Sequence, residues 1–322
     1  MESDQKTLTS DSVEELRKLV NEKKEKKLRV LQKMQTSHSD KLGVCFAIQG
    51  LKLSSPEETL EYSDAKIRRI EEPADFTELA VVLSNYCDYS RIGHYLYHCD
   101  YELFFPLKKE DYENENLILL LAKHLFSLMR IRCGIDFIVP MVANRSWSVI
   151  SACPPKSVNV IMLEDYPDAI RFSDNNIVEL SDFKWVIDYL DKYLRLVRNK
   201  RMGVAVDALS SLYRQKNDRM AIACMWAGIE AILDIQSELR FRISSEIAAF
   251  LEQRGNERLR VYKDIKKQYD FRSKAVHGAA IDESIIRENV AKVRDILRTV
   301  LTKCIELDHI PTSSEFEDGI HL

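Results

Sequence analysis

Apolar residues recur every three or four positions through the second half of the chain, which is the spacing of one helix face. Proline, which interrupts helices, is absent between Pro167 and Pro311. Gly255 suits the end of one helix, and Asp282 suits the start of another. Helices of this length with short connections pack as bundles, so we predict an all-α bundle over residues 179–310. Its six helices are predicted near residues 185–196, 202–213, 222–233, 239–251, 259–269 and 286–304.

The first half of the chain has a mixed pattern. Runs rich in β-branched and aromatic residues, bounded by Gly, Pro and Asp, predict strands at residues 43–49, 94–104 and 158–162. Residues 115–132 carry the apolar spacing of a helix. We therefore predict an α+β domain over residues 38–178, and the fold class α+β for the chain as a whole.

Two terminal segments flank these domains. Residues 1–37 predict a charged helix from about residue 11 to residue 35, opened by the capping-box pair Ser12 and Glu15. The last segment, residues 311–322, is acidic, and we expect it to form a flexible tail.

Charge is unevenly distributed along the chain. The 322 residues carry a formal net charge of −4, so the protein as a whole does not attract a polyanion. Residues 254–274 nevertheless hold eight basic residues against three acidic ones, a local net charge of +5. A local patch of this kind suits a nucleic acid, although a solvated helix face has the same composition.

The cysteine pattern and the apolar runs exclude several classes of protein. The seven cysteines are scattered without a Cys-x-x-Cys pair, which argues against a disulfide framework or a zinc site. With nine glycines in all, a nucleotide-binding loop has little to be built from, and we expect no cofactor. No apolar run approaches the roughly 18 residues of a membrane span. We expect a soluble cytoplasmic protein that binds neither metal nor membrane.

The segment with the clearest chemistry is residues 269–278, which read Tyr-Asp-Phe-Arg-Ser-Lys-Ala-Val-His-Gly. Arg272 is a fixed cation and His277 a titratable imidazole, five positions apart. Such a pair can hold a phosphodiester and move protons on and off it. The spacing alone is weak, because Arg91 and His98 form a comparable pair inside an aromatic run, where we interpret the histidines as structural.

An acidic residue lies upstream of this segment. Glu230 follows Trp226 by one helical turn and lies on or beside the apolar stripe of its helix. A carboxylate near a core requires a cation or hydrogen-bond donors. Arg272 and Arg242 are both candidate partners, and a buried pair that only stabilises the bundle is the structural alternative.

Two motifs together resemble the HEPN domain, in the branch similar to ApeA-type abortive-infection proteins. They are Trp-x-x-Ile-Glu, within residues 223–233, and Tyr-x-x-Arg-Ser-x-x-Val-His-Gly, residues 269–278. The resemblance covers about residues 181–308. It implies a bundle of four to six helices that forms a homodimer, so that two Arg-x4-His motifs share one cleft. It also implies a metal-independent endoribonuclease that acts in phage defence or as a toxin.

The resemblance also assigns roles to residues. Arg272 would hold the scissile phosphate, His277 would be the general acid and base, and Glu230 would orient one of them. Ser273 stands where active members often carry Asn, Asp or His, and it is included among the catalytic residues because serine can donate a hydrogen bond. The basic residues expected to contact RNA are Lys266, Lys267, Lys274 and Arg242.

Two other functions stay open. The helical domain could be a catalytically silent module that binds RNA or a nucleotide, or that serves as an assembly platform; Ser273 and the acidic total charge favour this hypothesis. Alternatively, residues 38–178, which carry no recognised family motif, could be a sensor or adaptor for a phage component or another protein. The helical domain would then be its output.

Overall fold

The computed structural model describes residues 42–164 except 57 and 84–88, residues 176–321 except 213, 214, 216 and 236, and residues 14, 18, 21–29 and 32. The contacts divide the described residues into two compact units. The first, here called the sheet unit, comprises the described residues within 1–50, 55–115 and 138–165. The second, the helical unit, comprises the described residues within 51–54, 116–137 and 166–322. The sequence predicts a single domain boundary near residue 178. In the structure, residues 116–137, which precede that boundary, nevertheless group with the helical unit.

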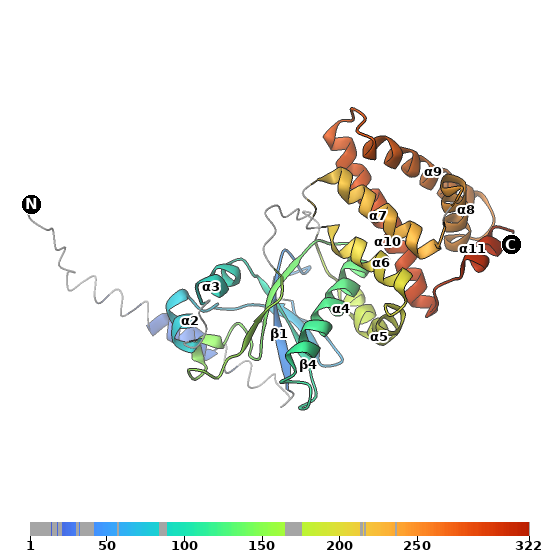
Figure 1. The fold of residues 1–322 in the computed structure, drawn as a ribbon. Helices are drawn as coiled ribbons and strands as arrows, with labels where there is room; N and C mark the ends of the chain where they lie inside the picture. The colour runs from blue at the N-terminus through green and yellow to red at the C-terminus, as the bar shows by residue number, and fades with distance from the viewer. Residues whose placement is uncertain are drawn as a thin grey trace, which may run out of the picture. The chain divides into compact units, whose positions relative to one another are not determined.

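The sheet unit is built on a six-stranded antiparallel sheet with the strand order β2-β3-β4-β1-β5-β6. Its strands β1 and β4 lie side by side (Figure 1). The central strands β1 and β5 are almost wholly buried, which accounts for their continuous apolar sequences. The α+β class predicted for the chain is confirmed. The strands are β1 (Gly43–Gln49), β2 (Leu60–Tyr62), β3 (Ala65–Arg69), β4 (Tyr101–Pro106), β5 (Ile138–Ala143) and β6 (Val160–Met162).

Helix α3 (Tyr89–Tyr97) corrects the strand predicted at residues 94–104. Ile92, Tyr95 and Leu96 are buried at helical spacing, and the extended strand β4 begins only at Tyr101. Aromatic content alone therefore misled the prediction over the first half of this run. The other helices of the sheet unit are α2 (Phe76–Val82), which Asp75 caps, and the short 3₁₀ helix η1 (Ile150–Ala152).

The helical unit contains the predicted helices and one unpredicted helix near the C-terminus. Residues 313–321, expected to be a flexible tail, form helix α11 (Ser313–His321), whose Phe316 is buried and packs on Phe250 at a ring distance of 5.3 Å. The remaining helices are α4 (Glu115–Cys133), α5 (Leu180–Leu196), α6 (Lys200–Ser210), α7 (Asp218–Leu233), α8 (Leu239–Leu251), α9 (Asn256–Val276) and α10 (Glu283–Leu307). The N-cap predicted at Asp282 is confirmed, because its side chain accepts a hydrogen bond from the backbone of Ser284.

Arg298 of α10 explains why α4 belongs to the helical unit. Its guanidinium donates to the carbonyls of Ile131 and Arg132, at 2.8 and 2.6 Å. The last carbonyls of a helix have no partner within it, so these bonds cap the end of α4. Gly134, at φ +65°, makes room for this contact, since a Cβ there would lie 2.2 Å from the Arg298 guanidinium.

The predicted N-terminal helix over residues 11–35 falls largely outside the described residues, as does its capping pair Ser12 and Glu15. Residues 21–29 are helical. Among the helices that the structure describes, none is long and apolar enough to cross a membrane.

A buried carboxylate organises one side of the sheet unit. Glu102 of β4 is fully buried and accepts hydrogen bonds from the Arg68 guanidinium at 2.7 Å, the Ser146 hydroxyl at 2.6 Å and the Trp147 backbone N–H at 2.6 Å. The Trp147 indole N–H reaches the Cys45 carbonyl on β1. The carboxylate thus joins two strands to the segment that follows β5.

Replacing Glu102 with Ala should destabilise the sheet unit by about 3–5 kcal/mol, because Arg68 would keep a buried, uncompensated charge. Hydrogen exchange of the β1 and β4 amides during urea titration measures this loss. Glu61→Ala is the control, since Glu61 of β2 pairs with Lys66 at the surface and its loss should cost less than about 1 kcal/mol. Equal effects of the two substitutions would contradict the assigned role of Glu102.

Candidate active site on α7 and α9

One face of α7 carries the side chains that hold the candidate site. Arg219, Trp226 and Glu230 are spaced seven and four residues apart, so they share one face over three turns of helix. Asn217 begins the helix by accepting hydrogen bonds from the backbone of Arg219 and Met220. The first and last of the three side chains are thereby held about 16 Å apart along a regular helix.

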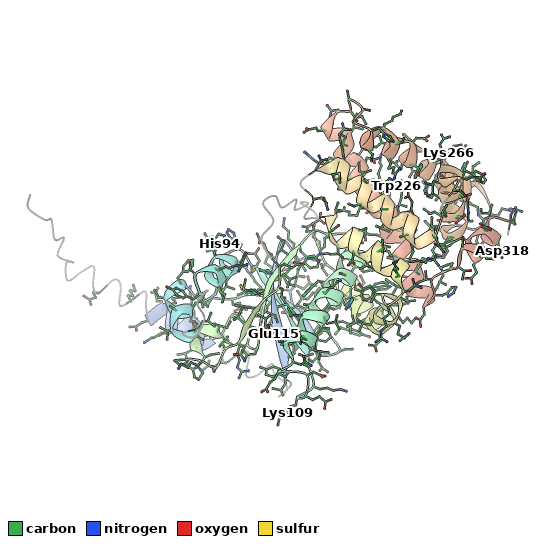
Figure 2. All side chains as sticks on the ribbon, viewed as in Figure 1. His94, Lys109, Glu115, Trp226, Lys266 and Asp318 are labelled. Carbon is green, nitrogen blue, oxygen red and sulfur yellow. The ribbon has the colours of Figure 1, made fainter. Side chains whose placement is uncertain are left out.

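Helix α9 packs against this face through an aromatic pair. Tyr269 of α9 meets the fully buried Trp226 of α7 (Figure 2) edge to face, with ring centroids 5.1 Å apart and planes at 90°. Edge-to-face packing of this kind adds a directional contribution to apolar burial. The pair therefore fixes both the separation and the rotation of α9 relative to α7.

Arg272 lies one turn after Tyr269 and is the arginine that meets Glu230. Its Nη2 is 3.5 Å from the Glu230 Oε1, and the Tyr269 hydroxyl is 3.4 Å from the same oxygen. The other candidate, Arg242, instead contacts Glu246 at 2.9 Å and also pairs with Glu317. Of the two partners that the sequence left open for Glu230, the structure places Arg272 there.

The Arg272 guanidinium is held loosely. A separation of 3.5 Å makes an ionic contact but not a good hydrogen bond. Its Nε is buried and has no hydrogen-bond partner among the described residues, while its Cζ lies 5.5 Å from the centroid of the Tyr269 ring. The side chain is 27% exposed. The exposed part of the guanidinium can therefore meet an incoming anion, whereas the buried Nε cannot.

His277 lies where α9 ends. Its side chain is exposed, and its backbone N–H bonds the Ser273 carbonyl at 3.2 Å. The next residue, Gly278, has φ +77°, a left-handed conformation that favours glycine after a helix. The imidazole therefore projects from a defined helix end into solvent.

Within one chain, Arg272 and His277 do not converge. Five residues of helix correspond to about 7.5 Å along the axis and about 140° of rotation around it. Arg272 contacts Glu230 of α7, whereas the His277 side chain is exposed at the end of α9. Two sets of these side chains, side by side, would let both kinds of group reach one phosphate.

The other predicted site residues are distributed along α9. Ser273, Lys267 and Lys274 are exposed, and Lys267 and Lys274 share a face because they are seven residues apart. Lys266 (Figure 2) is half-buried, with its Nζ 5.4 Å from the centroid of the Tyr262 ring. Arg242, as described above, is engaged by two glutamates of α8 and α11.

Neighbouring charges tune the Tyr269 phenol. Burial raises its pKa, the Glu230 carboxylate raises it further, and Arg272 lowers it. The phenol is therefore protonated at neutral pH and can donate to Glu230. The phenol and the Arg272 guanidinium thus both contact the Oε1 of Glu230.

Two cysteines and one histidine of the helical unit lie in surroundings that favour their neutral forms. Burial raises the pKa of the Cys133 and Cys304 thiols to about 12, so neither is a thiolate nucleophile at neutral pH. Burial also lowers the pKa of His124, which packs edge-on against Tyr193 as expected of a core histidine. The described residues include no cluster of three or more His, Cys, Asp or Glu side chains that could hold a metal.

Two contacts of the site, those made by the Arg219 guanidinium and by the Tyr269 hydroxyl, were not predicted from the sequence. Arg219 stands at the polar start of α7, where arginine usually faces solvent. Its spacing of eleven residues from Glu230, three turns on the same face, was a usable signal. Tyr269 was named as an apolar position and as the first residue of the motif, but not as a partner of Glu230, which its hydroxyl reaches.

A comparison of the chain with protein-family models, curated proteins and solved structures found no match. The roles of these residues therefore rest on their geometry and on the motif in the sequence.

We expect Tyr269 to titrate above the ordinary tyrosine value near 10, and Glu230→Gln to lower that pKa because it removes a neighbouring negative charge. NMR of ring-labelled tyrosine measures it, with Tyr269→Phe to assign the resonance and Glu257→Gln as control. Because folding raises this pKa, the contribution of Tyr269 to the free energy of unfolding is fully present below about pH 10. That contribution is lost as the pH rises through the pKa of the folded state. An unchanged pKa in Glu230→Gln would contradict the contact.

Proposed function

We propose that the chain is a metal-independent endoribonuclease of the HEPN type. In this reaction the ribose 2′ oxygen attacks the adjacent phosphorus, and the bond from phosphorus to the 5′ oxygen breaks. The 2′-OH loses a proton and the leaving 5′ oxygen gains one, so the products are a 2′,3′-cyclic phosphate and a free 5′-OH. The observation that carries the proposal is a loosely held arginine on the same helix end as an exposed histidine.

Arg272 would bind the scissile phosphate and stabilise the charge that develops on its oxygens. Guanidinium matches the phosphate geometry through two parallel hydrogen bonds. Glu230 keeps the side chain at the α7 surface, and the long 3.5 Å contact leaves the exposed part of the guanidinium able to bind a phosphate. Removing a comparable stabilising donor costs about 100-fold to 1,000-fold in rate in well-studied enzymes.

His277 would transfer the protons. An imidazole is the side chain best suited to give and take protons near neutral pH. Its exposed position at the end of α9 makes it accessible to an RNA backbone. Ser273 precedes it by one turn and could donate a hydrogen bond to the same phosphate, while Lys267 and Lys274 would attract the flanking RNA.

A homodimer through the helical unit would supply the second set of side chains. Exposed apolar residues support it: Met220 at the start of α7, Val276 at the end of α9 and Ile285 at the start of α10 are 55%, 43% and 49% exposed. Large apolar side chains exposed around a charged motif are typical of protein interfaces. The interface would bring two copies of the motif to one cleft.

The cellular role follows only from the resemblance. We propose a cytoplasmic toxin or abortive-infection nuclease whose trigger, a phage component or another protein, acts through the sheet unit.

A catalytically silent RNA-binding or nucleotide-binding module is the second candidate. The divergence of Arg272 and His277 around α9 favours it for a single chain. So does Ser273, which lacks the stronger polar groups of active family members. Binding without cleavage would identify this function.

Incubation with total RNA and with synthetic single strands tests the nuclease. Arg272→Ala and His277→Ala should each lower cleavage by about 100-fold to 10,000-fold without loss of folding, because they remove charge stabilisation or proton transfer. His309→Ala is the matched control, an exposed histidine that pairs with Glu315 away from α9. New ends should carry cyclic phosphate, and a 2′-deoxy nucleotide at the cut should block the reaction. Full activity of both variants, or cleavage of the deoxy substrate, would overturn the mechanism.

The dimer has its own test. Val276→Glu and Ile285→Glu should shift the protein from dimer to monomer in light scattering and abolish cleavage, because buried charge opposes association. Leu259→Glu, equally exposed near the other end of α9, should leave the mass unchanged. A monomeric wild type with full nuclease activity would contradict the shared cleft.

A further inference from the structure

Arg219 of α7 binds the turn that carries His277. Its Nη1 donates to the Ala275 carbonyl at 2.6 Å, and its Nη2 donates to the Ala279 carbonyl at 2.8 Å. The two carbonyls belong to residues on either side of His277 and Gly278. One guanidinium therefore spans the turn from its first residue to its last.

The turn has few other constraints. Its backbone bonds are His277 N–H to Ser273 carbonyl at 3.2 Å, Gly278 N–H to Ala275 carbonyl at 3.4 Å and Ala279 N–H to Lys274 carbonyl at 3.1 Å, all longer than the most common value of about 2.9–3.0 Å. Gly278 has open space around its Cβ position. Hydrogen bonds from a charged donor are shorter and about twice as strong as neutral ones. Arg219 is thus the main side-chain restraint on the path of the chain past His277.

We propose that Arg219 is the positioning residue for His277, which it holds at the angle needed for proton transfer. This inference rests on the proposed nuclease function. Arg219 touches no reacting atom, and it acts through the backbone of residues 275–279. A displacement of about 1 Å at a catalytic group can cost on the order of 100-fold in rate.

The same helix then holds both halves of the motif. Arg219 fixes the turn of His277, and Glu230, three turns later on the same face, contacts Arg272. Their separation is set by the rise of α7, about 16 Å over eleven residues. Trp226 between them packs against Tyr269 and keeps the two helices in register. Helix α7 therefore acts as a rigid template for the catalytic end of α9.

The surroundings of Arg219 allow this side chain to be shortened without damage to the apolar core. Its side chain is half-buried and lines a polar cavity of about 330 Å³ together with Asn217, Glu283 and Arg287. Water can fill such a site when the guanidinium is shortened. Arg219→Gln should therefore loosen the turn without opening a dry hole in the core.

Arg298 offers a matched control for a purely stabilising role. It also donates to two carbonyls at a helix end, but that helix is α4 and carries no part of the motif. Arg298→Gln removes a contact of the same chemistry elsewhere in the helical unit. Arg219→Lys keeps the charge and can satisfy one carbonyl well.

The experiment compares three variants of the full chain, Arg219→Gln, Arg219→Lys and Arg298→Gln. Two quantities are measured for each: the cleavage kinetics on a defined RNA, and the hydrogen-exchange rates of the amides of residues 277–279. Arg219→Gln should lower kcat by about 10-fold to 100-fold with KM within about 2-fold, and should speed exchange in the turn at least about 10-fold. The lysine variant should recover part of both. Arg298→Gln should lower the melting temperature while changing neither kcat nor exchange in the turn.

Unchanged exchange at residues 277–279 in Arg219→Gln would overturn the proposal, as would an equal loss of kcat in Arg298→Gln. If the wild type cleaves no RNA, the nuclease proposal fails by itself. The exchange data and the His277 ring resonances then decide separately whether Arg219 orders the turn.

Discussion

The contact between Trp226 and Tyr269 is the interaction on which the site depends. The first ring is fully buried and the second nearly so, and their perpendicular packing sets how α9 lies on α7. Burying one large aromatic side chain contributes about 1.5–3 kcal/mol, and the edge-to-face geometry adds about 0.5–1.5 kcal/mol. The contacts of Glu230 with Arg272 and Tyr269 are made about one helical turn from this pair.

The ion pair between Glu230 and Arg272 plays a smaller energetic part. Both side chains are partly exposed and their closest atoms are 3.5 Å apart, so the pair contributes at most about 1 kcal/mol. Aromatic packing therefore holds the helices, whereas the ion pair only orients the guanidinium. A weak pair suits a binding site better than a strong one, because a phosphate can then recruit Arg272 without first breaking a short salt bridge.

Helical spacing in the sequence was enough to predict α5 to α10 and to place Glu230 beside the core, since both follow from a local 3.6-residue period. Contacts between distant residues left no such signal. Glu102 draws its partners from 34 and 44 residues away, and Arg219 reaches carbonyls nearly 60 residues later. The choice of Arg272 over Arg242 likewise depended on α11, which binds Arg242 through Glu317 and was not predicted as a helix.

A crystal structure of the protein bound to an RNA with a 2′-deoxy nucleotide at the cleavage site tests the central claim most directly. The account predicts one phosphate within about 3 Å of an Arg272 guanidinium and hydrogen-bonded to a His277 imidazole, with two copies of the chain around it. A phosphate bound away from α9, or Arg272 still paired only with Glu230 in the complex, would contradict it.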